Sequence, residues 1–183
     1  RVDSGRLYAD DGTEYDADVL VIATGFDVLN FITTYEAKGR SGVSLADQWE
    51  HDNAQAYLGT VVPNFPNFFT LYGPNLQPGH GGSLIFVVEM QVRYIMDMIQ
   101  KMLDQNIGSV EIRQEVHDGY NQDVDQAHEQ MVWTHPGMTS YYRNDRGRIV
   151  VNSPWRNVDF YEMTREANLS DYLIEPVSEL VAD

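Results

Sequence analysis

The stretch that most limits how this chain can fold is residues 16–27, which read DADVLVIATGFD. Residues 19–23 form an unbroken apolar run of strand length, rich in β-branched side chains. A continuous run, unlike an alternating one, predicts a strand buried on both faces, as in a parallel sheet. Gly25 then ends the strand, and its missing Cβ permits unusual backbone angles or close approach of a ligand. Ligands of open α/β sheets bind at the carboxyl ends of strands, so this turn is a candidate ligand contact. The alternative is an ordinary glycine turn after a buried strand.

Charge and composition narrow the class of protein. Among 183 residues, 28 are acidic and 12 basic, which gives a net charge of −16. Such a surface repels nucleic acid and anionic membranes, so neither is an expected partner. There is no cysteine, which excludes a disulfide framework and fits a reducing compartment. With no signal-peptide core and no apolar run near the ~20 residues of a membrane span, a cytoplasmic protein is expected, either one domain or part of a larger chain.

The first half of the chain carries clear local signals. Asp-Gly at residues 11–12 predicts a β-hairpin. Ser44 predicts the cap of a short helix over residues 45–49. A further strand is predicted over residues 68–72, before a glycine- and proline-rich loop.

The second half reads mainly as helices. Ser83 is expected to cap a long helix that enters through the interior at residues 84–88, which are apolar all round, and that runs to about Leu103. Beyond it the pattern predicts a helix end at Gly108, a strand over residues 109–113, an amphipathic helix over residues 120–131, a hairpin over residues 139–152, a last helix over residues 158–167 and a frayed acidic tail.

Residues 73–82, GPNLQPGHGG, are the densest glycine and proline cluster in the chain. Glycines just before a helix free backbone N–H groups to approach an anion or a polar ring edge, and the helix dipole adds partial positive charge. The dinucleotide fingerprint G-x-G-x-x-G and the Walker A loop are both absent from the chain. His80 in this loop is a candidate ligand contact or general acid/base, with capping of loop carbonyls as the equal alternative.

Other residue types suggest less chemistry. No histidine stands at metal-ligand spacing with another histidine or a carboxylate, so no metal site is expected. His117 and His128 are expected on the solvated face of a helix. No G-x-S-x-G elbow is present, which disfavours a hydrolase. The aromatic residues near the end are expected in the core and at interfaces: Trp133, Tyr141, Tyr142 and Trp155.

Taken together, ADVLVIATGF, YLGTVVPNFPNFFTLYGPN and PGHGGSLIFVVEMQVRYI closely resemble the C-terminal third of flavin-dependent Baeyer–Villiger monooxygenases, from about Gly5 to Tyr172. Residues 131–165 look most like the branch that acts on aryl ketones such as hydroxyacetophenones. The resemblance implies an α/β fold, the C-terminal portion of a Rossmann-like FAD/NAD(P)-binding flavoprotein with a long central helix and peripheral hairpins. It makes residues 1–183 one fragment of the FAD-binding domain, in which 1–27 hold the hairpin and Ala-Thr-Gly strand, 68–104 the strand-loop-helix at the flavin, and 109–183 the C-terminal helices and hairpin.

The resemblance also implies an oxidoreductase that uses FAD, NADPH and O₂ to insert oxygen into a ketone and give an ester. It assigns no catalytic residue to this chain, with His80 as the one candidate for an assisting donor. The implied ketone-binding residues are Leu76 and Gln77. The implied cofactor-binding residues are Ala23, Thr24, Gly25, Asn75, Gly79, His80 and Gly81.

The chain departs from the family pattern in what it lacks. Both dinucleotide fingerprints, the sequence signature between them and the family's arginine near the flavin are missing, and Tyr141 stands where many members have tryptophan. A fragment that is inactive alone is therefore expected. The alternatives are a non-catalytic small binding module and a subunit that completes a flavin site with another chain. Apolar surfaces that would face the missing domains predict self-association.

Overall fold

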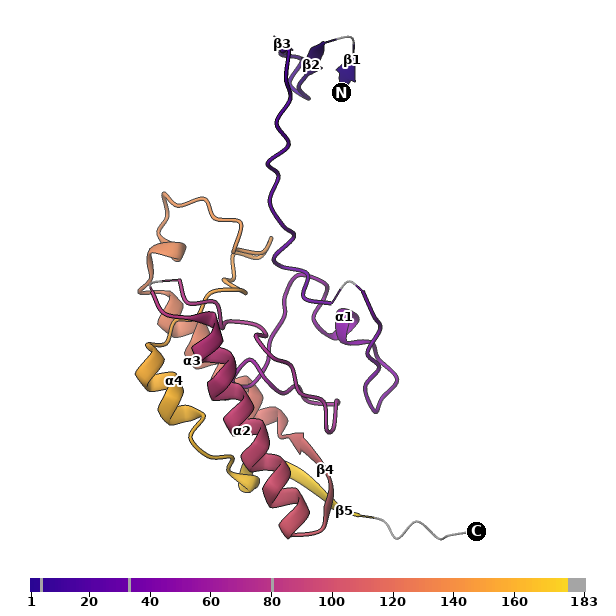
Figure 1. Ribbon diagram of the computed structural model, residues 1–183, viewed down its shortest axis with the longest axis vertical. Coiled ribbons are helices and arrows are strands. Elements are labelled where there is room, and N and C mark those ends of the chain that lie inside the picture. The colour runs from indigo at the N-terminus through magenta and orange to yellow at the C-terminus, as the bar shows by residue number, and fades with distance from the viewer. Residues whose placement is uncertain (4, 33, 80, 178–183) are drawn as a thin grey trace.

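The computed structural model describes residues 1–3, 5–32, 34–79 and 81–177, and it divides into an extended N-terminal arm and a packed body (Figure 1). The arm comprises the described part of residues 1–30, and the body the described residues from 31 onward. The elements in chain order are β1 (Val2–Asp3), β2 (Arg6–Tyr8), β3 (Glu14–Asp16), α1 (Leu45–Gln48), α2 (Leu84–Asp104), β4 (Ile107–Ile112), α3 (Gln114–His128), η1 (Val132–Thr134), α4 (Asn157–Met163), η2 (Leu169–Asp171) and β5 (Tyr172–Pro176).

The arm begins with the predicted hairpin, which is confirmed. β2 pairs antiparallel with β3, with Leu7 opposite Tyr15, and β1 pairs on the other side of β2. Gly12 takes φ +86° in the turn, which a residue with a Cβ resists.

The prediction of a buried strand over residues 19–23 is wrong for this structure. Residues 17–29 form neither helix nor strand, and Figure 1 shows them as an extended link between the hairpin and the body. Val21 is 79% exposed and Ile22 is 78% exposed. A strand needs a neighbour for its backbone N–H and C=O groups, and no described segment pairs with this one.

α1 has the predicted cap. The Ser44 hydroxyl accepts from the Asp47 backbone N–H at 3.1 Å and donates to the Asp47 carboxylate at 2.7 Å. The helix brings Leu45 and Trp49 into a small core that lies beside the body's main core. The buried members of this small core are Leu45, Trp49, Ala54, Ala56, Val62, Phe65 and Val150.

The prediction of a strand over residues 68–72 is also wrong, because the backbone there bonds to a turn and a side chain instead of a ladder. Thr70 N–H donates to the Thr60 carbonyl at 2.8 Å, and Tyr72 N–H donates to Gln91 Oε1 at 2.7 Å. Gln91 is fully buried on α2, and its Nε2 bonds to Thr60 Oγ1 at 2.8 Å and to the Gly59 carbonyl at 3.1 Å. A single glutamine thus fastens two loop segments, residues 59–60 and residues 70–72, to the helix.

α2 is the long helix that the pattern predicts, and its inner face carries the main core. Met90, Tyr94 and Met98 are buried against β4 and β5, and the Tyr94 and Tyr172 hydroxyls share a short hydrogen bond. Within the described residues, no helix combines the length and apolarity that a membrane crossing needs.

Two details of α2 differ from expectation. Its first residues do not enter through the interior: Leu84 is 49% exposed and Ile85 is 62% exposed, since no described segment covers that end. The helix ends at Asp104, close to the predicted Leu103, but Gly108 does not terminate it, because Asn106 takes the left-handed turn at φ +54° and Gly108 already lies within β4.

Part of the tail expected to fray forms β5, which pairs antiparallel with β4, with Val110 opposite Ile174. Residues 178–183 of that tail lie outside the described residues. Long-range pairing of this kind leaves no signal in the residues between the two strands. The last helix is confirmed as α4 but is shorter than predicted. The hairpin expected over residues 139–152 reduces to one bridge, Arg143 to Ile149, around a turn.

Candidate functional site

The loop at residues 73–79 is held in place by a second segment, residues 149–153. Asn75 N–H donates to the Val150 carbonyl at 2.9 Å, and Gln77 N–H donates to the Val151 carbonyl at 3.1 Å. Ser153 N–H returns a bond to the Gln77 carbonyl at 2.8 Å, and Gln77 forms a parallel bridge with Asn152. The loop is therefore part of the body's framework. Next to its start lies a hollow of about 210 Å³, lined mainly by Phe31, Trp49 and residues 69–73.

Asn75 is the residue that locks this loop. It is 2% exposed and has a left-handed backbone, with φ +57°. Its Nδ2 donates to the Ile149 carbonyl at 2.8 Å and the Asn152 carbonyl at 3.3 Å, while Oδ1 accepts from Arg148. Both ends of the amide are thus engaged inside the chain.

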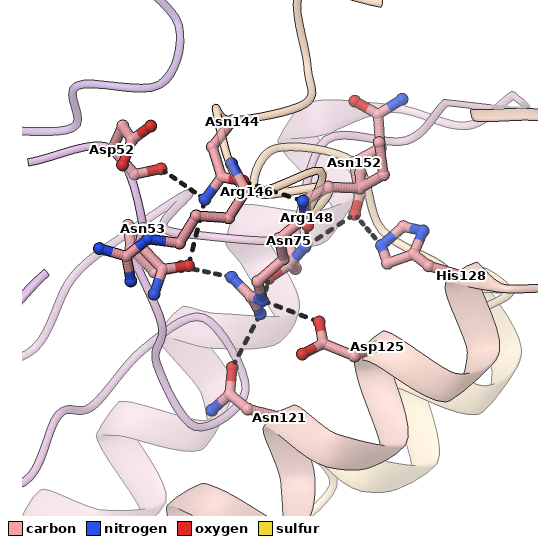
Figure 2. A network of polar contacts seen from close by, with 12 residues as sticks. Asp52, Asn53, Asn75, Asn121, Asp125, His128, Asn144, Arg146, Arg148 and Asn152 are labelled. Atoms are coloured by element: carbon pink, nitrogen blue, oxygen red, sulfur yellow. Dashed lines mark hydrogen bonds and ion pairs between the residues drawn. The ribbon is translucent and has the colours of Figure 1, made fainter. Parts of the chain in front are cut away.

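Arg148 lies at the centre of the polar network that Figure 2 shows. Its Nε donates to Asp125 at 2.8 Å and its Nη1 to the Ala54 carbonyl at 2.9 Å. Its Nη2 donates to Asn75 Oδ1 at 3.2 Å and Asn121 Oδ1 at 3.3 Å. Burial lowers the pKa of Arg148, and the Asp125 carboxylate opposes that shift.

The predicted ketone-side residues have different surroundings. Leu76 is 1% exposed and packs within the main core. Gln77 is half-buried, and its Nε2 donates to the Tyr142 hydroxyl at 3.1 Å. Tyr142 in turn packs edge-on against Trp133, with ring centroids 5.7 Å apart. An aromatic cluster therefore lies against the loop.

Gly79 packs closely against the Asn152 side chain and Trp133. A Cβ on Gly79 would lie 2.7 Å from Trp133 Cζ2 and 2.9 Å from Asn152 Nδ2, so only glycine fits. Asn152 is fully buried, yet neither polar atom of its amide has a hydrogen-bond partner within the described part of the chain. A buried amide without partners costs free energy, so the two polar atoms of Asn152 lower the stability of this part of the body.

His128 contacts the backbone of Asn152. It is 2% exposed, and its Nε2 contacts the Asn152 carbonyl at 3.0 Å. A carbonyl only accepts, so Nε2 carries the proton. Burial lowers the pKa of His128 to about 4. His117 is also buried, at 5% exposed. The expectation that both histidines lie on a solvated face is therefore wrong, because α3 packs both inward.

The end of the loop leads directly into α2. Gly81 and Gly82 take φ +109° and +124°, and space is open around a Cβ on Gly81. Ser83 stands at the N-cap position without a side-chain cap, so α2 begins with partial positive charge and with backbone N–H groups that no described side chain caps. His80, the predicted assisting donor, lies outside the described residues.

The other predicted cofactor contacts lie on the arm. Ala23, Thr24 and Gly25 are exposed, and Gly25 has φ +75° with open space around a Cβ. Within the described residues no hydrogen bond joins them to the loop at residues 75–79, so the structure does not bring the two halves of the predicted site together. The open space around Gly81 and the partial positive charge at the start of α2 would accept the polar ring edge of a flavin, and no residue in the described part of the chain forms a phosphate loop.

No family model matches this chain. It is 45% identical over 176 residues to an uncharacterised monooxygenase of Sinorhizobium fredii, covering 96% of this chain and 27% of the relative. It is 32% identical over 162 residues to a Baeyer–Villiger monooxygenase of Pseudomonas aeruginosa, covering 88% of this chain and 30% of the relative. Its homologues are flavin monooxygenases. The chain spans less than a third of the length of these two relatives and corresponds to the C-terminal part of such proteins.

The structural comparison confirms the predicted fold class. The crystal structure of OTEMO in complex with FAD and NADP superposes with a TM-score of 0.72 at 22% identity, over 89% of this chain and 30% of that one. The fold is thus that of the C-terminal portion of FAD/NADP-binding flavin monooxygenases, a mixed α/β arrangement of small sheets and a long helix.

Sequence reasoning missed Arg148, Asn152 and His128. Arg148 follows a glycine in an Arg-Asn-Asp-Arg-Gly turn, where a cation reads as solvated charge. The one signal for it was the apolar run directly after it, which places Arg148 at the entrance of a buried segment.

Proposed function

We propose that this chain is the C-terminal part of an FAD- and NADPH-dependent Baeyer–Villiger monooxygenase, and that the whole protein is an oxidoreductase. The observation that carries the proposal is the 32% identity to a Baeyer–Villiger monooxygenase over 88% of the chain. The open space around a Cβ on Gly81 and the uncapped start of α2 support it independently, since they leave room and partial positive charge for a polar ring edge.

The proposed reaction converts a ketone, O₂, NADPH and a proton into an ester, water and NADP⁺. FAD, when bound, would supply the oxygen activation. The finer proposal is that the substrate is an aryl ketone, and the sequence of residues 131–165 supports it. A cytoplasmic location is proposed with it, on the composition and the lack of cysteine.

The chain's own residues have separable roles in this proposal. Ala23, Thr24 and Gly25 would form the turn against the flavin, and Gly79 and Gly81 would let backbone N–H groups reach its polar edge. The α2 N-terminus would favour negative charge that develops there. Gln77 would face the ketone beside Tyr142, whereas Leu76 would shape that wall from within the core.

Gly25→Val in the full-length protein tests the turn. We expect the FAD content per polypeptide to fall while the yield of folded protein holds, because a branched Cβ would occupy the space next to the cofactor. Gly12→Val is the matched control, since Gly12 also has a positive φ and open space around a Cβ but lies in the hairpin. Wild-type FAD stoichiometry in Gly25→Val would exclude this turn from the flavin site.

We also propose that the 183-residue chain is inactive alone, because it holds no dinucleotide phosphate loop. The purified chain should not consume NADPH when FAD and an aryl ketone are added. Ketone-dependent NADPH consumption would overturn this. Size-exclusion chromatography would test the proposed self-association through the exposed apolar residues of the arm.

A further inference from the structure

The Arg148 side chain is 11% exposed, and among the described residues its one anionic partner is Asp125. Removing a guanidinium from water is costly unless it is paired and its N–H groups are bonded. Arg148 meets both conditions by contacting three separate parts of the chain: Ala54 after α1, Asn75 in the loop, and Asn121 with Asp125 on α3. Its position therefore joins segments that are far apart in sequence (Figure 2).

The hydrogen-bond acceptors of Arg148 differ in charge, so they contribute to its binding in two ways. Asp125 supplies the negative charge that neutralises the guanidinium. The Ala54 carbonyl and the two asparagine side chains are neutral, so they add direction more than charge. Only a planar fork with several N–H groups reaches all of these at once, and a lysine ammonium has no comparable geometry.

The bond to Asn75 fixes which way that amide points. A guanidinium only donates, so the Asn75 atom that faces Arg148 must be Oδ1. Nδ2 is thereby directed at the Ile149 and Asn152 carbonyls, which only accept. Arg148 thus sets the orientation in which Asn75 can join the loop to residues 149–153.

The same segments carry Gly79 and the buried Asn152 amide. Asn75 is four residues before Gly79, and the Asn152 carbonyl that it contacts belongs to the residue with the free amide. Gln77 lies between Asn75 and Gly79 in the sequence, and its backbone N–H and carbonyl are hydrogen-bonded to residues 151 and 153. A turned Asn75 would place two donors against Arg148 and an oxygen against two carbonyls, and would displace this pair of segments.

We propose that Arg148 is a positioning residue for the flavin-facing loop, acting through Asn75 on Gly79 and on the Asn152 amide. This rests on the proposed function. Arg148 itself touches neither cofactor nor substrate in this assignment. Its removal should therefore alter how the flavin is held at temperatures where the protein is fully folded.

The experiment uses the full-length protein and measures the FAD dissociation constant of the apoprotein by fluorescence, the absorption spectrum of bound flavin, and the melting temperature. Arg148→Lys keeps the charge opposite Asp125 but cannot orient Asn75. We expect it to recover most of the melting temperature lost in Arg148→Met, while FAD binding stays about tenfold weaker and the flavin spectrum stays shifted.

Two further variants make the result decisive. Arg146→Met is the matched control, because Arg146 lies two residues away, is more than half exposed and pairs with Glu50, so neither FAD affinity nor spectrum should change. Asn75→Asp keeps an attractive partner for Arg148 but loses both donors to the carbonyls, and should reproduce the tenfold loss. It also serves if Arg148→Met does not fold.

The outcomes separate the two proposals. Wild-type FAD affinity and spectrum in Arg148→Lys and Asn75→Asp, whatever their melting temperatures, would overturn the positioning role. A wild-type full-length protein that binds no FAD would overturn the proposed function instead.

Discussion

Two short apolar runs of similar composition have opposite fates in this molecule. Residues 19–22 read VLVI and lie exposed on the arm, whereas residues 149–151 read IVV and are buried in the body. Neither run is part of a regular strand. The difference is that residues 150 and 151 accept backbone hydrogen bonds from Asn75 and Gln77, and no described segment pairs with the first run. A continuous apolar run therefore indicates that a segment is stabilised by burial. The segment becomes buried only where a neighbouring segment forms hydrogen bonds with its backbone.

Truncating one isoleucine in each run tests this contrast most strongly. Ile149 is 2% exposed, so Ile149→Ala should lower the free energy of unfolding of the 183-residue chain by about 2–5 kcal/mol. Ile22 is 78% exposed, and Ile22→Ala should change it by no more than about 0.5 kcal/mol. Urea denaturation measures both. Equal losses would mean that the arm is packed in solution.

His128, which lies in the body, makes the free energy of unfolding depend on pH. Its folded-state pKa of about 4 lies below the ordinary value of 6.5, so the unfolded chain takes up the proton first as pH falls. The free energy of unfolding should thus decrease between about pH 6.5 and pH 4, by up to roughly 3 kcal/mol from this group. Carboxylates titrate in the lower part of this range, so the measured quantity is the difference between wild type and His128→Gln.

His51 provides the control for that experiment. It is exposed in the turn after α1, so His51→Gln measures what the same substitution does at an exposed position. An identical profile in His128→Gln would show that this histidine is solvated.

Gln91 tests whether the body's loops depend on the helix behind them. Gln91→Leu removes the acceptor of Tyr72 N–H and the donor to Thr60, and should lower the free energy of unfolding by about 2 kcal/mol. Gln100→Leu on the exposed face of the same helix removes one bond to Asp104 and should change it by no more than about 0.5 kcal/mol. Thermal unfolding of the two variants side by side would reveal any reversal of that order.

The smallest effect compares two serines at helix starts. Ser44 caps α1 with its hydroxyl, so Ser44→Ala should cost about 1 kcal/mol. Ser83 makes no such bond, and Ser83→Ala should be close to neutral in melting temperature. A larger loss at Ser83 would indicate a cap that forms in solution.

Local signals in the sequence predicted local structure well. The Asp11–Gly12 turn, the Ser44 cap and the start of α2 depend on residues a few positions apart, and all three are present. Residues 19–23 and 68–72 carry strand-like patterns but find no ladder, because pairing depends on segments elsewhere. For the same reason the pairing of β5 with β4 could not be foreseen.

The candidate site divides along the same line. Its glycines were visible in the sequence, since missing side chains and turn chemistry are local properties. Arg148 and Asn152 were not, because their importance comes from burial and from partners up to 94 residues away. The roles of the predicted site residues stay predictions.

The pairing of β4 with β5 has a consequence for the order in which the protein is made. Tyr172 fills the main core, and its strand closes the sheet against residues 107–112. During synthesis the hairpin at residues 2–16 can form as soon as it leaves the ribosome, but the core stays open until Pro176 has emerged. A ribosome stalled before that point would hold a nascent chain whose α2 is already made and still has its apolar face in water.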